Sequence, residues 1–207
     1  MSIGGASNAD YTTIVDLLRH GEPQGGRRFR GQSDDPLSDL GWRQMRDAVG
    51  DAAPWQHIVS SPLQRCSAFA REVADRHRLA CTLEPGFKEI RFGAWEGFTA
   101  EEIQRRDGER YRRYREDPES FMPAGAESMA DFVARVARTW ESLLGAQRGR
   151  HVLLVCHAGV IRAVLGTVLG ITPKNLFRVK IDYASLSRFE VVNGQAPTLV
   201  FHGGKLP

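Results

Sequence analysis

The sequence contains few cysteines, and their spacing suits neither a metal site nor a disulfide framework. Three cysteines, Cys66, Cys81 and Cys156, are spread over 207 residues without a CxxC pair. Zinc sites and disulfide-rich folds depend on paired or regularly spaced cysteines, so neither class is expected. Unpaired cysteines fit a reducing compartment, and we expect a cytoplasmic protein.

Long apolar runs are also missing. No run reaches the roughly 18 residues of a membrane-spanning helix, so no contact with a membrane is expected. The stretch from Met1 to Asp10 is rich in Ser, Gly, Ala and Asn and lacks the basic and apolar regions of a signal peptide. We predict a flexible tail over residues 1–10 and a single domain over residues 11–207.

A strong excess of one charge is absent. The net charge of +3 is too small to predict nucleic-acid binding. The arginines between positions 105 and 115 alternate with Glu and Asp, which indicates a solvated helix face. Hydrophobic residues make up 42% of the chain and charged residues 26%, and no repeat divides it. This balance is typical of a globular domain with a substantial core.

Strand-like and helix-like segments alternate along the chain. The apolar run from His151 to Cys156 is the clearest strand and suits a central parallel position. The stretch from Ser128 to Leu144 places Phe132, Val136 and Trp140 on one stripe, which predicts an amphipathic helix. The alternation predicts an α/β fold, a three-layer α/β/α sandwich around a mostly parallel central sheet. Further strands are expected over residues 12–18, 57–60, 81–83, 177–181, 185–191 and 198–201, and further helices from Ser38, Pro62, Thr99 and Val160.

Two histidines directly follow the two clearest strands. His20 comes after TTIVDLLR and His157 after HVLLVC, and each is closely followed by a glycine, Gly21 or Gly159. Ligand sites in open α/β sheets form at the carboxyl ends of strands, so we expect both imidazoles in one crevice. Glycine allows the backbone to approach a ligand closely. Either histidine alone would more often be structural, and it is the pair that indicates a site.

Arginines and a carboxylate accompany the histidines. Arg19 directly precedes His20, and Arg65 lies one turn into the helix after the second strand. Guanidinium groups match phosphate oxygens in bidentate fashion, so these residues predict a pocket for a phosphoryl dianion. Glu89, in a loop rich in glycine, could protonate a leaving alkoxide and then deprotonate water. Glu96 in the same loop is the alternative acid.

Four ordered motifs carry a family resemblance. They read LLRHGE (17–22), SSPLQRC (60–66), KEIRFGAWEG (88–97) and VCHAGVIR (155–162). With these motifs the chain resembles the histidine phosphatase superfamily, in its phosphoglycerate-mutase-like branch, from Thr12 onward. The resemblance implies a phosphoglycerate-mutase-like fold and a phosphomonoesterase that needs neither a metal nor a cofactor.

The resemblance also implies a role for each matching residue. His20 would attack phosphorus and become a phosphohistidine, which splits one difficult displacement into two easier ones. Arg19, Arg65 and His157 would hold the phosphoryl oxygens, and Glu89 would act as general acid and then as base. The substrate contacts expected from the same segments are Gly21, Arg30, Gln32, Ser33, Ala158 and Gly159.

Segments around these motifs suggest a substrate. LLRHGEPQGG, RFRGQSDDPLS (28–38) and WQHIVSSPLQRC (55–66) resemble bacterial α-ribazole phosphatases, which remove the 5′-phosphate of α-ribazole phosphate or of the cobalamin nucleotide loop. Phosphoglycerate mutases carry a Trp-Asn pair after RHGE and an HGNS run at the second histidine, and this chain has neither, which favours hydrolysis. The alternatives are a broad-specificity sugar or nucleotide phosphatase, a mutase, and a catalytically silent phosphate-binding relative. The expected partner is a small phosphate ester, and the chain is expected to be a monomer or a homodimer.

Overall fold

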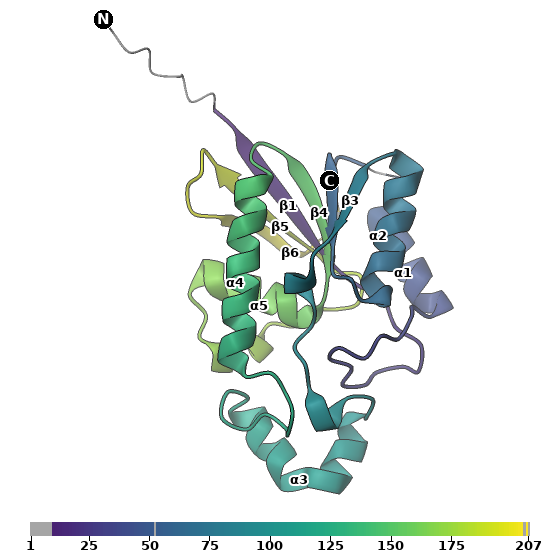
Figure 1. Cartoon of the computed structure of the whole chain (residues 1–207), viewed down its shortest axis with the longest axis vertical. Helices are drawn as coiled ribbons and strands as arrows, with labels where there is room; N and C mark the ends of the chain where they lie inside the picture. The colour runs from purple at the N-terminus through teal and green to yellow at the C-terminus, as the bar shows by residue number, and fades with distance from the viewer. Residues whose placement is uncertain (1–9, 52, 205, 207) are drawn as a thin grey trace, which may run out of the picture.

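A sheet of six strands forms the centre of the protein (Figure 1). Its strands are β1 (Thr12–Arg19), β2 (His57–Ser60), β3 (Ala80–Leu83), β4 (His151–Cys156), β5 (Leu186–Val192) and β6 (Thr198–Gly204). Their order is β3-β2-β4-β1-β5-β6. The strands β3, β2, β4 and β1 run parallel to one another, whereas β5 is antiparallel to both β1 and β6. The computed structural model describes residues 10–51, 53–204 and 206, so the predicted tail lies outside the described residues except for Asp10.

The register between the two central strands brings the two candidate histidines together. β1 and β4 are parallel neighbours, and Arg19 at the end of β1 is the partner of Cys156 at the end of β4. Each histidine is the next residue of its chain segment, and the His20 amide donates to the Cys156 carbonyl at 3.0 Å. His20 and His157 therefore stand at corresponding positions, each one residue beyond the end of its strand.

Helices cover both faces of this sheet and complete three layers. The helices α1 (Asp39–Val49) and α2 (Gln64–His77) pack on one face, against Leu18, Ile58 and Leu153. The helices α4 (Met129–Ala146) and α5 (Ala158–Leu169) pack on the other face. The predicted α/β/α sandwich with a mostly parallel sheet is confirmed.

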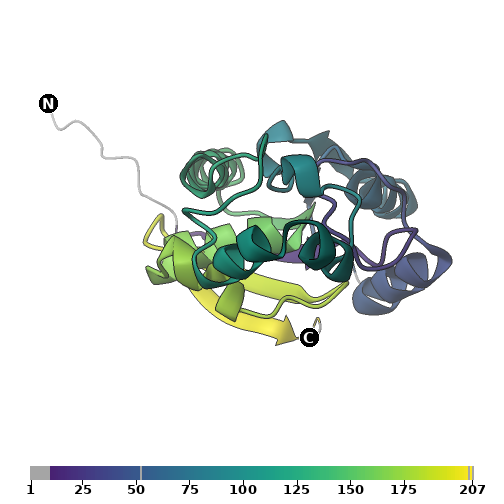
Figure 2. The same ribbon diagram turned by 90° about the horizontal axis from the view of Figure 1, so that it is seen from below.

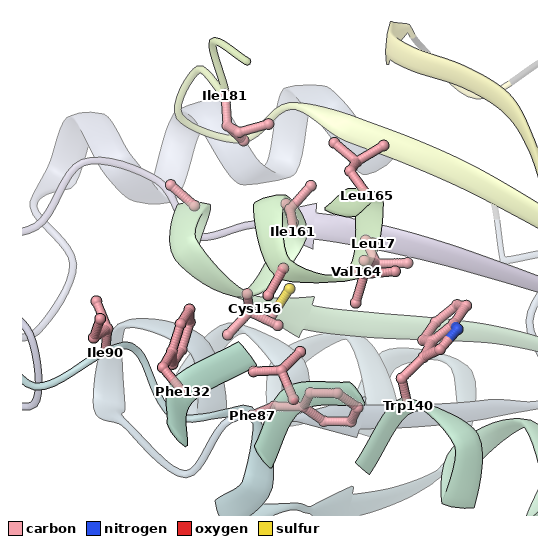
Figure 3. Packing of buried hydrophobic residues seen from close by; sticks show 14 of the residues in the cluster. Leu17, Phe87, Ile90, Phe132, Trp140, Cys156, Ile161, Val164, Leu165 and Ile181 are labelled. Carbon is pink, nitrogen blue, oxygen red and sulfur yellow. The ribbon is translucent and has the colours of Figure 1, made fainter. Parts of the chain in front are cut away.

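The helices begin and pack where the sequence indicates. Ser38 caps α1 by accepting from the Gly41 amide at 3.0 Å, which satisfies one of the free donors of the first turn. The predicted stripe of α4 is buried, and Figure 3 shows Phe132 and Trp140 meeting side chains of α5 and of the central strands. Within the described parts of the chain, no helix is both long and apolar enough to cross a membrane.

One helix lies apart from these layers, across the carboxyl end of the sheet (Figure 1 and Figure 2). This helix, α3 (Ala100–Glu116), starts after Thr99 as predicted, with a capping box in which Thr99 and Glu102 satisfy each other's backbone amides. Its backbone is kinked at Asp107, and of its side chains only Ile103 and Tyr114 are buried. Short 3-10 turns complete the chain at η1 (Pro85–Phe87), η2 (Gly93–Trp95) and η3 (Pro173–Arg178).

Two details of the predicted elements are wrong. No strand forms over residues 177–181, because a 3-10 turn begins at Pro173 and continues to Arg178. The carbonyl of Ile181 then accepts from the Arg19 side chain at 2.6 Å instead of joining a ladder. The helix α2 starts at Gln64 rather than at Pro62, since Leu63 is its extended N-cap residue.

Candidate active site

The two histidines lie side by side at the carboxyl ends of β1 and β4. The ring centroids of His20 and His157 are 5.2 Å apart, in an edge-to-face arrangement. His20 is 6% exposed and His157 is fully buried. The sheet register thus places two imidazoles against each other, with one of them open to a cavity.

Hydrogen bonds and burial determine the protonation of these rings. Nδ1 of His20 is 2.7 Å from the Gly21 carbonyl oxygen, which can only accept, so Nδ1 carries the proton and Nε2 keeps its lone pair. Burial, helped by the charges of Arg65 and Arg19, holds the pKa of His20 well below its usual value of 6.5. Burial and Arg65 likewise lower the pKa of His157, whose Nε2 is 2.8 Å from the Ser61 hydroxyl. Both rings are therefore neutral at pH 7.

Arg65 is a buried cation held by the loop that follows β1. Its Nη1 donates to the Ser33 carbonyl at 2.7 Å and its Nη2 to the Gly31 carbonyl at 2.6 Å. The side chain is 1% exposed and lines the cavity. Its remaining nitrogen, Nε, is buried and has no hydrogen-bond partner within the described residues. Such a preset guanidinium suits an anion in the cavity.

Arg19 is held by the segment that precedes β5. Its Nη1 donates to the Ile181 carbonyl, and its guanidinium lies over the Tyr183 ring, 4.0 Å from the centroid. The Ala184 amide donates to the His20 carbonyl at 3.3 Å, so the segment before β5 braces both residues. Burial lowers the pKa of Arg19 from its usual value, although an arginine stays charged at neutral pH.

The Glu89 carboxylate fits beside α5 in the cavity wall because residue 159 of that helix is a glycine. Its carboxylate accepts from its neighbour's amide, that of Ile90, at 3.0 Å and from the Gly159 amide at 3.1 Å. A side chain at position 159 would collide with this carboxylate. The alternative acid, Glu96, does not line the cavity, and its carboxylate accepts from the backbone amides of Phe92 and Gln32.

The cavity has a volume of about 690 Å³ and is strongly cationic. Eight arginine and lysine residues line it, against two glutamates, Glu89 and Glu101. Aromatic side chains form much of the remaining wall, namely Phe29, Phe92, Tyr111, Tyr114, Phe132, Phe177 and Tyr183. Its size suits a small metabolite with an anionic end and an apolar or ring-shaped part.

The predicted substrate residues divide into two groups. Arg30 and Gly159 line the cavity, whereas the other four do not. Gly21 lies where a side chain would collide with the Gly41 backbone. Gln32 donates through its side-chain amide to the Glu89 carbonyl at 3.3 Å, and Ser33 holds Arg65 through its carbonyl. Ala158 is buried at the start of α5. These four residues lie outside the cavity wall, where they pack against or hold the residues that form it.

Sequence reasoning missed several cavity residues, among them Arg162, Tyr183 and Arg27. Arg162 lies three positions after Gly159 on α5, so the helical repeat could have indicated it. Tyr183 and Arg27 lie in irregular segments, whose path no local pattern predicts. Among the described residues, no group of three or more His, Cys, Asp and Glu side chains is arranged to hold a metal ion.

Comparison with protein families gives one match over most of the chain. A sequence profile of the histidine phosphatase superfamily (branch 1) matches residues 15–203. That range includes both histidines, Arg19, Arg65 and Glu89. The profile therefore covers every residue that the geometry above brings to the cavity wall from the sheet ends.

Individual relatives carry different names. The bifunctional protein Rv2228c of Mycobacterium tuberculosis is 38% identical over 180 residues, which are 84% of this chain and 49% of that protein, so the chain spans about half of its length. A probable phosphoglycerate mutase, GpmB of Yersinia enterocolitica, is 30% identical over 85% of this chain and 84% of its own. Among solved structures, mycobacterial glucosyl-3-phosphoglycerate phosphatase Rv2419c is similar with a TM-score of 0.81, at 26% identity over 94% of this chain and all of that one.

Proposed function

Because the chain belongs to the histidine phosphatase superfamily, we propose that it hydrolyses phosphomonoesters of small metabolites through a phosphohistidine on His20. The observation that carries this proposal is the state of the His20 ring. Its Nδ1 proton is committed to the Gly21 carbonyl, and the neutral ring lines a cationic cavity. A lone pair on Nε2 beside preset arginines is what attack on a phosphoryl dianion requires.

The proposed reaction has two displacements. In the first, Nε2 of His20 bonds to phosphorus, the P–O bond to the alcohol breaks, and Glu89 gives a proton to the departing oxygen. In the second, water attacks the phosphohistidine while Glu89 takes a proton from it, which releases phosphate and restores both residues. The position of Glu89 on the cavity wall supports this assignment.

Arg19, Arg65 and His157 are the proposed holders of the phosphoryl oxygens. Both arginines are fixed by backbone carbonyls before any ligand binds, so little reorganisation accompanies the reaction. The neutral ring of His157 carries a single N–H group and can donate one hydrogen bond. Its Nε2 atom lies 2.8 Å from the Ser61 hydroxyl.

For the substrate, we take α-ribazole 5′-phosphate in cobalamin biosynthesis, in the cytoplasm, as the first hypothesis. The motif resemblance supports it, and the aromatic wall of Phe29, Tyr111 and Tyr114 could stack a ring system. The probable mutase among the relatives keeps mutase chemistry as the alternative. The absence of the Trp-Asn pair and of the HGNS run favours hydrolysis, by a narrow or a broad-specificity phosphatase.

Replacing His20 with Ala tests the chemistry. We expect the variant to lose turnover of 4-nitrophenyl phosphate. We also expect it to form no acid-labile phosphoprotein when its reaction with substrate is rapidly quenched. His57→Gln is the matched control, because His57 lies at the opposite end of its strand, away from the cavity. Retained turnover in His20→Ala would refute the proposal. Phosphate binding without any turnover by the unmodified protein would instead identify a silent relative.

A panel of substrates then tests the specificity. It compares kcat/KM for α-ribazole 5′-phosphate, sugar phosphates, nucleotides and phosphoglycerates. A preference of tenfold or more for α-ribazole 5′-phosphate would support the first hypothesis. Conversion of 3-phosphoglycerate to 2-phosphoglycerate that depends on 2,3-bisphosphoglycerate would support the mutase.

A further inference from the structure

Half of the cations in the cavity have neither a proposed phosphoryl role nor an acid partner. Arg19 and Arg65 are assigned to that group. Arg30 has an acid partner at 3.1 Å, Asp35, and Arg28 has one at 3.3 Å, Glu102. The structure gives no ion pair within the described parts of the chain for any of the other four cavity cations, Arg27, Arg115, Arg162 and Lys174.

Arg162 is the most deeply set of these four. It stands in the second turn of α5, where its Nε donates to the Val179 carbonyl at 2.9 Å and its guanidinium carbon lies 5.3 Å from the centroid of the Phe177 ring. These contacts fix the plane of the guanidinium. Its two terminal nitrogens make no hydrogen bond within the described residues, so they remain available to a ligand in the cavity. Burial also lowers the pKa of this arginine, partly countered by Glu89.

The other three cations come from three separate segments. Arg27 lies in the loop after β1, Arg115 near the end of α3, and Lys174 in η3, and all three are exposed at the cavity. Other arginines of α3 have acid partners, as Arg113 does with Glu109 at 2.7 Å. Like charges gathered from distant segments repel one another unless an anion lies between them.

We propose that Arg162, with Arg27, Arg115 and Lys174 around it, forms a second anion subsite that binds a carboxylate or a phosphate group on the alcohol part of the substrate. The substrate class is then a phosphomonoester with a second anionic group. This inference rests on the proposed function, because it takes the His20 end of the cavity as the place of the scissile phosphoryl group.

General electrostatic attraction is the competing explanation for the cations. Attraction of that kind acts on the phosphoryl dianion of every substrate and would raise turnover of all esters alike. A subsite acts only on substrates with a second anion. Matched pairs of esters separate the two explanations.

The test measures kcat and KM on two pairs of substrates. The carboxylate arm compares 3-phosphoglycerate with glycerol 3-phosphate. The phosphate arm compares 3-phosphonopropyl phosphate, whose phosphonate group cannot be hydrolysed, with propyl phosphate. The full chain is used, together with Arg162→Gln, Arg115→Gln and the control Arg178→Gln. Arg178 is exposed at the end of η3 and does not line the cavity. Thermal unfolding checks that each variant is folded, and Arg115→Gln serves if Arg162→Gln is not.

We expect the unmodified protein to prefer the doubly anionic member of at least one pair by about tenfold or more in kcat/KM, as for a charged hydrogen bond. The arm with the preference identifies the second anion. Arg162→Gln should reduce that preference at least about fivefold, mainly through KM, while Arg178→Gln keeps it. Equal turnover within both pairs, or an equal loss on both members in Arg162→Gln, would overturn the subsite but leave the phosphatase intact. Failure to hydrolyse any ester, 4-nitrophenyl phosphate included, would overturn the proposed function and the subsite with it.

Discussion

The glycine at position 159 allows one sharp test of the proposed general acid. In Gly159→Ala the new methyl group would overlap Oε1 of Glu89 and lie 3.0 Å from its carboxyl carbon and 3.2 Å from Cζ of Phe132. The Glu89 carboxylate is the end of a flexible side chain, so it can swing away while the backbone stays in place. It would then lose its hydrogen bond from the amide of residue 159.

The expected cost differs between folding and catalysis. Alanine is favoured over glycine within a helix by up to about 1 kcal/mol, which offsets part of the crowding, so stability should change by no more than about 1 kcal/mol. A positioned general acid contributes about 10²–10⁴ in rate. Alkyl phosphates need this proton because an alkoxide leaves poorly, and we expect their kcat/KM, which reports only the first displacement, to fall by about a hundredfold or more. The 4-nitrophenolate ion leaves without a proton, and its ester should lose less than about tenfold.

The assay compares kcat/KM for glycerol 3-phosphate and 4-nitrophenyl phosphate in three variants, because kcat also includes the second displacement, which is the same for both esters. Glu89→Gln should reproduce the split between the two esters. Gly145→Ala is the matched control, because it lies within α4 and a methyl group there meets nothing within 4 Å. Full activity of Gly159→Ala on glycerol 3-phosphate, or equal losses on both esters, would refute the role given to Glu89.

Two further predictions concern stability. Asp16 is fully buried and accepts from Arg188 at 2.7 Å and from His151 at 2.8 Å, so Asp16→Asn should cost about 3 kcal/mol of unfolding free energy in urea at pH 7; a cost below about 1 kcal/mol would contradict the reasoning. Burial holds the pKa of His20 and of His157 well below 6.5, so the unfolded chain binds more protons below that pH and the folded state loses stability as the pH falls from 6.5. The loss should reach about 1.4 kcal/mol per pH unit for each histidine, and a smaller slope in His157→Gln than in the unmodified chain checks its origin.

The central sheet could be predicted because its strands are locally unambiguous. The run from Val152 to Cys156 is apolar throughout and buried in the fold, and His151 before it is partly buried. The mistaken strand over residues 177–181 is apolar only at alternate positions, Phe177, Val179 and Ile181. There, however, Phe177 faces the cavity and Ile181 holds Arg19, so its apolar residues serve the site rather than a ladder.

The floor of the cavity, which is the part formed at the carboxyl ends of the strands, could be predicted for a related reason. His20 and His157 directly follow strands, so the parallel sheet alone brings them together. Tyr183 could not be found this way, because it lies between η3 and β5 in a segment whose direction depends on Ala184 adopting a positive φ of 53°. Local sequence patterns carry little information about such loop paths.

The floor and the roof of the cavity differ in how firmly they are anchored. The floor is built on strand ends inside the sheet, whereas the roof is α3, with its kink at Asp107 and only two buried side chains. Amide hydrogens of α3 should therefore exchange with solvent through low-energy local openings, while those of β1 and β4 exchange only when the whole domain unfolds. Substrates can be admitted and products released by movement of the roof, with the phosphoryl-binding groups kept in register throughout.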